Sequence, residues 1–395
     1  MFVSDFPLKG ERMQQSHDPA LHLRSITGLR FVASFLVLIC HIGFFFMPRI
    51  ETEGNTVTMF IYAAGSMSLS FFFLISGFIL TWIARPQEPK KAFWRRRVAK
   101  VLPNHLVTLA IAVVLMVTAG VGLTVSNTVP ALFLVQGWIP SQSVVFNFYS
   151  NDPTWSLSCE VLFYLAFPWL LVLARRIRPE RLWACVGALI AVVLVVPLLA
   201  GLLPDDEIAL GNMEPWLHVW FVNFLPLSRL LEFAIGILVA QIVINGKWIR
   251  VGLIPAGVLS VVGCAAMPYV PDGYNFVAVT VVPLVLVIGE AATADISGRR
   301  TAFSGRTMVW LGEISFALFM VHWLVIVYGP MDAGDPTAMA TTASGMLLDT
   351  ALSIAISLVL AWLLFVLVER PVVRRWSRPR RKPTVTAAPV PTPGS

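Results

Sequence analysis

The chain has 395 residues, of which 57% are hydrophobic and only 13% are Asp, Glu, Lys or Arg. Soluble domains carry about twice that charged fraction, so an ordinary water-soluble enzyme is excluded and most of the surface must face lipid. The net charge of +7 does not indicate nucleic-acid binding, because the basic residues are confined to short gaps between apolar stretches. The four cysteines lie inside apolar stretches without ligand spacing, so neither a disulfide framework nor a metal site is expected.

Apolar runs long enough to cross a bilayer divide the chain into segments. About 30 Å of hydrocarbon requires roughly 20 helical residues. The sequence therefore predicts an all-α polytopic membrane protein with about ten transmembrane helices in one bundle. The predicted spans are 27–48, 59–83, 101–122, 156–174, 182–203, 225–244, 251–268, 275–292, 307–328 and 346–368. The stretch 129–139 is too short to span and is expected to lie at the interface or to re-enter the bilayer.

The two ends of the chain differ from this apolar middle. Residues 1–22 are polar and lack the layout of a cleaved signal peptide, so we expect a cytoplasmic N-terminal segment that leads into a retained first helix. Residues 23–375 form the predicted transmembrane domain. The segment 376–395 is basic at first and then rich in Pro, Thr and Ala, a composition that indicates a disordered cytoplasmic tail.

The distribution of Lys and Arg predicts the orientation of the spans. With a cytoplasmic N-terminus, 27 of the 29 basic residues fall into inside segments, as the positive-inside rule requires. We therefore expect a multi-pass protein of the plasma membrane with both termini in the cytoplasm.

The first predicted span contains Arg30 and His41. They are eleven residues apart, which places them on one helix face about 16 Å apart along the axis. Ionisable groups are costly to place inside a membrane, so each of them is a candidate for a functional site. Arg30 has an equally good interpretation as an interfacial arginine, and His41 has an alternative as a hydrogen-bonded core histidine.

A basic cluster precedes the third predicted span and includes Arg96, Arg97 and Lys100. A role in setting topology explains these charges about as well as a phosphate-binding site does. The i, i+3 spacing of Arg97 and Lys100 would place two cations on one helix face, as an anionic, phosphate-bearing ligand requires.

The fourth predicted span carries Ser158, Glu160 and Tyr164 close to its start. Glu160 is expected at a depth comparable with His41, where its carboxylate could accept a ring proton of the histidine and raise its basicity as a general base. The hydroxyls of Ser158 and Tyr164 lie nearby, and hydrogen bonding between helices is as good an explanation for them as catalysis.

Later spans add further ionisable groups. Arg229 and Glu232 have i, i+3 spacing and indicate an ion pair tolerated near the outer boundary. His322 lies in the outer half of the ninth predicted span and could join the chamber of His41. Glu369 is expected at a cytoplasmic helix end, buried at the interface.

Taken together, these residues resemble the acyltransferase 3 family of integral-membrane O-acyltransferases, from about Leu23 to Arg375. The similar features, in order, are Arg30 with ten positions to His41, FFFLISGFIL at 71–80, Ser158-x-Glu160-x-x-x-Tyr164, RLLEF at 229–233 with Gly236, LGEISF at 311–316 leading to His322, and ERP at 369–371. One departure is Arg97-x-x-Lys100 where the family usually shows Arg-x-x-Arg, which keeps the charge but loses a bidentate fork.

The resemblance implies transfer of an acyl group from cytoplasmic acyl-coenzyme A to a hydroxyl, usually of a sugar. It implies His41 as catalytic base, Glu160 as its support, and Arg30, Arg97 and Lys100 as contacts for the donor or for the structure; Arg96 belongs to the same basic cluster. Acyl-CoA would be a co-substrate, with no permanently bound cofactor. The opening SITGLRF at 25–31 is similar to actinobacterial members, some of which acylate macrolide antibiotics, so a glycosylated macrolide and an envelope glycan both stay open as acceptors.

Two other classes of function compete with this interpretation. Buried Arg, His and Glu in a helix bundle could form the proton relay of a secondary transporter, although no inverted repeat is visible. A non-catalytic membrane scaffold would leave the cost of placing His41 and Glu160 in the membrane unexplained. The sequence does not indicate an oligomeric state.

Overall fold

The computed structural model describes residues 23–50, 56–85, 88–209, 214–332 and 342–376. Within these ranges the chain is helical and contains no β-strand, apart from an isolated bridge between Ile208 and Pro215. The all-α class predicted from the composition is confirmed. The predicted N-terminal segment 1–22 and nearly all of the predicted tail lie outside the described residues.

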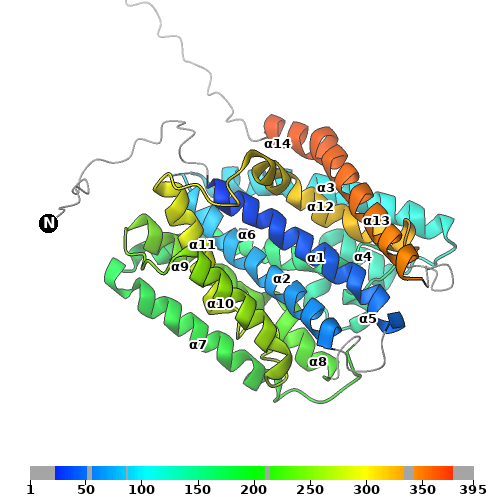
Figure 1. The fold of residues 1–395 in the computed structure, drawn as a ribbon, viewed down its shortest axis with the longest axis horizontal. Coiled ribbons are helices and arrows are strands. Elements are labelled where there is room, and N and C mark those ends of the chain that lie inside the picture. Colours follow the sequence, from blue (N-terminus) through cyan, green and yellow to red (C-terminus); the bar gives the residue numbers. More distant parts are fainter. Residues whose placement is uncertain (1–22, 51–55, 86–87, 210–213, 333–341, 377–395) are drawn as a thin grey trace, which may run out of the picture.

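Figure 1 shows the helices in the order in which they follow one another along the chain. Those of the first half are α1 (Arg24–Ile50), α2 (Thr56–Trp82), α3 (Lys90–Thr118), α4 (Val125–Phe133), the 3₁₀ turn η2 (Gln136–Trp138), α5 (Gln142–Val145), the 3₁₀ turn η3 (Asp152–Thr154), α6 (Trp155–Arg176), the 3₁₀ turn η4 (Pro179–Arg181) and α7 (Leu182–Ala200). Those of the second half are α8 (Trp216–Val219), the π-helical turn η5 (Trp220–Phe224), α9 (Pro226–Ile244), α10 (Leu253–Ala266), the 3₁₀ turn η6 (Met267–Tyr269), α11 (Val281–Ile296), α12 (Arg306–Tyr328), α13 (Ala343–Leu364), the π-helical turn η7 (Phe365–Glu369) and α14 (Arg370–Trp376).

Eight helices in the described ranges are long and apolar enough to cross a membrane, and they correspond to eight of the ten predicted spans. The other two predicted spans are shorter here. Residues 251–268 contain α10, with 14 residues, and 275–292 overlaps α11, with 16 residues. Pro268, Pro271 and Gly273, the last with φ of 76°, interrupt the apolar run between them. The count of ten is therefore not confirmed.

The start of α3 differs most from the sequence prediction. The apolar run was expected from residue 101, but the helix begins at Lys90, after Pro89. Lys and Arg are good helix formers, and their long stems can lie along apolar neighbours while the charge stays in a polar environment. The basic cluster is therefore part of a membrane helix and not of a loop.

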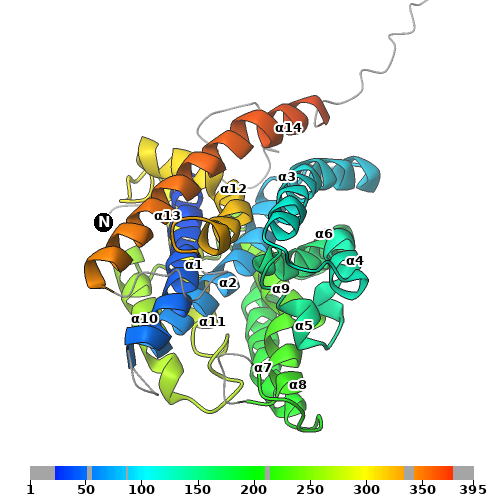
Figure 2. The same cartoon turned by 90° about the vertical axis from the view of Figure 1, so that its right-hand side faces the viewer.

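The centre of the bundle is formed by α1, α2, α9 and α12, with α1 lying beside both α2 and α12 (Figures 1 and 2). The helices α2 and α9 cross where Gly77 faces the backbone of Phe233 and Gly236 faces the backbone of Leu74. A Cβ atom at either glycine would collide with the opposing carbonyl oxygen. Close backbone approach through small residues is the usual way for helices to pack in lipid.

One end of the bundle collects basic loops. Ser25 at the start of α1 donates its hydroxyl to the Asp295 carboxylate at 2.6 Å and lies 2.7 Å from the Thr301 hydroxyl. Trp183 Nε1 donates to the Lys247 carbonyl oxygen at 3.1 Å. The connections 177–181, 245–252 and 297–305 therefore share the end at which α1 begins, and we name it the basic end.

The segment 134–154 covers the other end of α12. Trp323 Nε1 donates to the Phe148 carbonyl oxygen at 2.8 Å, and the Tyr328 hydroxyl donates to the Tyr149 carbonyl oxygen at 2.6 Å. Asn151 Nδ2 donates to the Met320 carbonyl oxygen at 2.7 Å. The stretch 129–139, predicted as too short to span, thus leads into a segment that is hydrogen-bonded to α12. The helix α6 begins directly after this segment.

Candidate active site

Two histidines from different helices meet inside the bundle. His41 lies on α1 and His322 on α12, and their Nδ1 and Nε2 atoms are 2.8 Å apart. The rings are nearly parallel, with centroids 5.1 Å apart and an interplanar angle of 14°. His322 is 1% exposed, whereas His41 is partly exposed. The two histidines, which the sequence suggested could lie together, are thus joined by a direct hydrogen bond.

Aromatic side chains fix the position of this histidine pair. The Trp323 ring meets His41 edge-on at 5.1 Å, and Phe45 and Phe148 lie 5.6 and 5.8 Å from the Trp323 ring. Trp323 is itself held by its bond to the Phe148 carbonyl oxygen. His41 thus contacts Trp323, and the Trp323 ring is held in place by Phe45 and Phe148.

A cavity of about 140 Å³ lies nearer the basic end, and charged side chains stand in its otherwise largely apolar wall. It brings together Arg30 from α1, Arg97 and Lys100 from α3, and Glu160 and Tyr164 from α6. Four of the charged residues that the sequence assigned to donor contacts or catalysis thus share one space. The cavity does not include His41 among its lining residues.

The three cations of the cavity have different surroundings. The Lys100 ammonium group forms an ion pair with Glu369, whose other oxygen accepts from Asn104 Nδ2 at 2.7 Å. Within the described part of the chain, the guanidinium groups of Arg30 and Arg97 form neither a hydrogen bond nor an ion pair; Arg97 lies 5.8 Å from the ring of Phe93. Unpaired guanidinium groups in a cavity are suited to an anionic ligand.

Glu160 belongs to this cavity and not to the histidine pair. Its carboxylate accepts from the Tyr164 hydroxyl at 2.7 Å and shares the cavity with the cations Arg30, Arg97 and Lys100. The expectation that Glu160 accepts a ring proton of His41 is corrected here, because His322 occupies that position. The reason is the depth of Glu160 along the bundle axis. Asn151 is hydrogen-bonded to Met320, close to His322, and α6 begins shortly after Asn151 in the chain. Each residue of α6 advances about 1.5 Å toward the basic end, so Glu160 lies closer to that end than the histidine pair does.

One aromatic ring connects the cavity with the histidine pair. Phe319 lines the cavity, and its ring centroid is 5.8 Å from that of His322. One turn before it on α12, Phe316 lines the same cavity and lies 5.5 Å from the Lys100 ammonium group. The wall of the cavity thus extends along α12 from Lys100 to the neighbour of His322.

Two of the predicted site residues have protein partners outside the cavity. The Ser158 hydroxyl lies 3.3 Å from Gln136 Oε1 and accepts from the Gly137 backbone N–H at 3.3 Å. Arg96 forms an ion pair with Glu88 near the start of α3. Ser158 therefore fastens the turn η2 to α6, and Arg96 stabilises the start of α3.

Arg229 and Glu232 form an ion pair on α9, with Nε and Oε2 3.2 Å apart. Both are 1% exposed, and Arg229 Nη2 also donates to the Ser70 hydroxyl at 3.4 Å. The Arg229 guanidinium group lies 5.0 Å from the ring of Phe73. The pair is thus buried between α9 and α2, where it connects the two helices that cross at Gly77 and Gly236.

Sequence reasoning missed two residues that shape the site, Asn104 and Phe319, and the partner of a third, Glu369. Glu369 is 2% exposed and forms an ion pair with Lys100, and Asn104 is its second partner. Phe319 was not singled out. Glu369 had a signal, because a carboxylate at membrane depth requires a partner. Phe319 had none, since one aromatic in an apolar helix looks like any other core residue.

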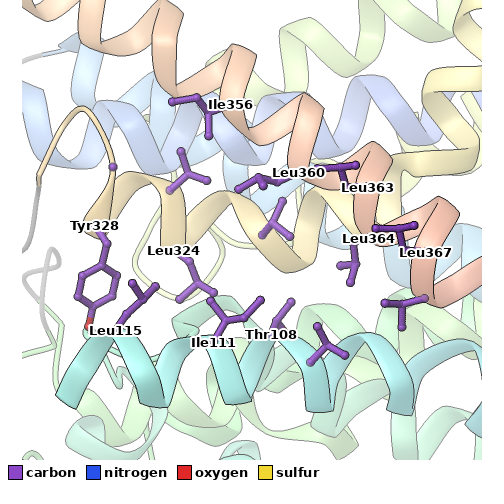
Figure 3. A pocket seen from close by; sticks show the side chains of 15 residues that line it. Thr108, Ile111, Leu115, Leu324, Tyr328, Ile356, Leu360, Leu363, Leu364 and Leu367 are labelled. Atoms are coloured by element: carbon purple, nitrogen blue, oxygen red, sulfur yellow. The ribbon is translucent and has the colours of Figure 1, made fainter. Parts of the chain in front are cut away.

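A second hollow lies between α3, α12 and α13 and has a volume of about 400 Å³ (Figure 3). Aliphatic side chains from these helices form its walls, among them Ile111, Leu324 and Leu360. No charged residue of the described chain lines it. Apart from Thr108 and Tyr328, the residues that line it are apolar, as expected of a groove that faces hydrocarbon.

Several known proteins are similar to this chain over part or most of its length. A family profile described as an acyltransferase domain matches residues 23–366. Acyltransferase MdmB of Streptomyces mycarofaciens is 38% identical over 378 residues, which cover 93% of this chain and 95% of the relative. O-acetyltransferase OatA of Staphylococcus aureus (strain NCTC 8325 / PS 47) is 25% identical over 187 residues, 44% of this chain and 28% of the relative. Nodulation protein 10 of Rhizobium leguminosarum bv. viciae is 26% identical over 188 residues, 44% of this chain and 49% of the relative. No solved structure matches.

Proposed function

The chain belongs to the acyltransferase 3 family and is a membrane-embedded O-acyltransferase, and we propose that its donor is acyl-coenzyme A and its acceptor a hydroxyl group of a sugar or glycosylated compound. One observation carries the proposal. Arg30 and Arg97 form neither a hydrogen bond nor an ion pair in the described chain, and they line a cavity whose wall includes Phe319, the aromatic neighbour of His322 in the His41–His322 pair. Groups suited to an anion and a candidate base thus lie on either side of the Phe319 ring.

The donor would bind with its phosphates at the cations and its thioester toward the histidines. Arginine is well suited to phosphate because its planar fork can donate two parallel hydrogen bonds. Arg30 and His41 are eleven residues apart on α1, which corresponds to about 16 Å along the helix. This separation suits the long pantetheine arm that joins the phosphates of coenzyme A to its sulfur.

The reaction would follow general-base catalysis. His41 takes the proton of the acceptor hydroxyl as the oxygen attacks the thioester carbonyl carbon. A C–O bond forms, the C–S bond breaks, and the thiol of coenzyme A leaves with the proton that His41 had taken. The products are an ester and free coenzyme A. Glu160 would act at a distance from this step, by keeping Arg30 and Arg97 in place around the donor.

The acceptor class rests on the relatives. The name of the staphylococcal relative specifies O-acetyl transfer, and the near full-length relative from Streptomyces is named an acyltransferase. We propose a glycosylated macrolide as the first acceptor to test and an envelope glycan as the second. The basic end of the bundle would face the cytoplasm across the plasma membrane, because Lys and Arg collect on that side of multi-pass proteins.

The decisive experiment compares cells that make the protein with cells that make His41→Ala, at equal membrane abundance. Mass spectrometry of small metabolites and envelope glycans should reveal an acyl-sized mass increase only in cells with the unchanged protein. His218→Ala is the matched control, since His218 bonds the Leu203 carbonyl oxygen away from the site and should leave the product unchanged. An acylated product that persists in His41→Ala cells would remove the base role. Identical profiles in a host that contains the acceptor would favour the transporter alternative.

A further inference from the structure

We propose that His322 is a positioning residue that fixes the ring proton of neutral His41 on Nδ1, so that Nε2 of His41 is the basic atom of the site. The proposal rests on the base role given to His41 in the proposed function and adds which atom takes the proton and why. It follows from the hydrogen bonds that three of the four ring nitrogens make in the described chain.

The first step concerns Nδ1 of His322. This atom lies 2.9 Å from the Phe319 carbonyl oxygen and 3.2 Å from the Leu318 carbonyl oxygen, both on its own helix. A carbonyl oxygen only accepts hydrogen bonds, so Nδ1 must carry a hydrogen and donate it. A neutral His322 then has its lone pair on Nε2.

The second step concerns the contact between the rings. Nε2 of His322 and Nδ1 of His41 are 2.8 Å apart, so one of them donates and the other accepts. Donation by His322 would require this ring to be protonated at both nitrogens and therefore charged. His322 is 1% exposed, and its polar partners in the described chain are two carbonyl oxygens and His41, with no carboxylate among them. A buried charge without a counter-ion is costly in the membrane, so His322 is neutral and accepts from Nδ1–H of His41.

The third step follows for His41. With its single ring hydrogen on Nδ1, the lone pair is on Nε2. His41 is the partly exposed member of the pair, whereas His322 is buried, so a substrate meets His41 first. Trp323 stands edge-on to the His41 ring and limits its rotation. Nε2 is thus the nitrogen that remains available to an acceptor hydroxyl.

The arrangement also supports the charge that appears during the reaction. When Nε2 takes the proton, the imidazolium ring of His41 still donates from Nδ1 to His322, whose Nδ1 still donates to the backbone. A hydrogen-bonded partner that holds a catalytic histidine in one tautomer and orientation is usually a carboxylate. Here a second, neutral histidine has that function and adds no negative charge next to the thioester.

The tautomer can be measured without any substrate. Protein labelled with ¹⁵N at its histidines is reconstituted in lipid vesicles and examined by solid-state NMR, and the His41 signals are assigned by their loss in His41→Gln. The chain has six histidines, so the spectrum is simple enough to resolve. We expect a protonated Nδ1 and an unprotonated Nε2 at His41. A proton on Nε2 would overturn the proposal.

Two substitutions separate the hydrogen bond from simple packing. His322→Phe fills the space but cannot accept, and His41 should then move its proton to Nε2, the form that free neutral histidine favours. His322→Gln offers an amide oxygen as acceptor, and the proton should stay on Nδ1. His218→Phe makes the same change of side chain away from the site and should alter neither signal. An unchanged His41 tautomer in His322→Phe would contradict the proposed role.

Kinetics with acetyl-CoA and a glycosylated acceptor complete the test. We expect His322→Phe to lower kcat about 100-fold while KM for acetyl-CoA changes less than about 3-fold, and His322→Gln to recover about tenfold of the loss. An unchanged kcat in active His322→Phe protein would sink the positioning role and leave the proposed function intact. A protein with the expected tautomer that transfers no acyl group would instead sink the proposed function.

Discussion

At the residue scale, three cations face one cavity, and in the described part of the chain only Lys100 among them forms an ion pair with a carboxylate. Lys100 is paired with Glu369, so its charge is already neutralised by the protein. Arg30 and Arg97 are left to a ligand. The departure from Arg-x-x-Arg to Arg97-x-x-Lys100 thus has a structural counterpart: an ammonium group suffices for a single carboxylate, whereas phosphate recognition benefits from a guanidinium fork.

Arg97 is the residue whose loss should weaken donor binding most selectively. Replacement of Arg97 by Ala should raise KM for acetyl-CoA about 10- to 100-fold, since a charged hydrogen bond to phosphate contributes about 1.5–3 kcal/mol. The kcat value should change little, because the histidine pair is untouched. Lys91→Ala removes an exposed cation from the same helix and serves as control. An equal effect of both substitutions on KM would mean that only the overall positive charge matters.

Glu369 should matter for stability more than for chemistry. Glu369→Gln leaves the Lys100 ammonium group without its carboxylate, and removal of one partner of a buried ion pair costs about 3–5 kcal/mol; with Lys100 30% exposed, we expect about 2 kcal/mol. The measurement is thermal unfolding in detergent. The double variant Lys100→Met with Glu369→Leu should recover most of the loss. Failure of the double variant to recover would show that the bond from Asn104 dominates.

The residues themselves could be singled out from the sequence, but their partners could not. Arg30, His41, Glu160 and His322 stand out because ionisable groups at membrane depth require an explanation. Which of them meet depends on the vertical offset between helices, and a hydropathy pattern fixes that offset only to within several residues. A shift of this size places Glu160 beside Arg30 and gives His41 a second histidine as its neighbour.

At the element scale, close packing of two helices at glycine residues holds the centre of the bundle together. The α2–α9 crossing depends on Gly77 and Gly236, each of which faces an opposing carbonyl oxygen. The buried Arg229–Glu232 pair and its bond to Ser70 lie between the same two helices. Because α2 also forms part of the cavity wall through Leu69 and Ile79, any separation of α2 from α9 would widen this cavity.

Gly236→Ala should therefore destabilise the protein. The added methyl group collides with the Leu74 backbone, and overpacking of this kind typically costs about 1–3 kcal/mol. The matched control is Gly187→Ala on α7, where a Cβ atom meets nothing within 4 Å. That substitution should be neutral or slightly stabilising, because alanine is the better helix former. Equal thermal stability of the two variants would contradict the tight crossing.

The presence of a helix can be predicted from this sequence far better than the residues at which the helix begins and ends. Eight spans are long, apolar runs of the kind that only a membrane helix satisfies. The segments 251–268 and 275–292 were expected to be equally long, but Pro268, Pro271 and Gly273 shorten the helical part. The start of α3 differs for the opposite reason: a search for apolar residues begins the span at residue 101, although the charged residues before it are good helix formers.

At the scale of the whole molecule, charge is distributed along the axis of the bundle. The basic loops share one end, the unpaired cations lie inside the bundle on that side, and the histidine pair lies beyond them. A soluble, polyanionic donor that enters from the basic end would meet increasing positive charge until the cations of the cavity are reached. The acceptor would then approach His41 from another direction, since the donor occupies the cavity.

Labelling of single cysteines tests this axial arrangement. The four native cysteines are first replaced, and a cysteine is then introduced at Arg178, in an exposed connection at the basic end, or at Asp272, in the exposed connection between α10 and α11. A maleimide that cannot cross the membrane should label Asp272→Cys in intact cells and Arg178→Cys only after permeabilisation. The reverse pattern would place the basic end outside and exclude a cytoplasmic donor.

The aliphatic groove between α3, α12 and α13 has a practical consequence for anyone who extracts this protein. Its walls include Ile111, 46% exposed, and Leu367, 68% exposed, so the groove opens toward the surrounding chains of the bilayer. An apolar hollow of about 400 Å³ next to the helix that bears His322 is occupied by hydrocarbon as long as a membrane is present. Detergents with long, flexible tails should replace that hydrocarbon, whereas short-tailed ones should leave α12 poorly supported and the preparation short-lived.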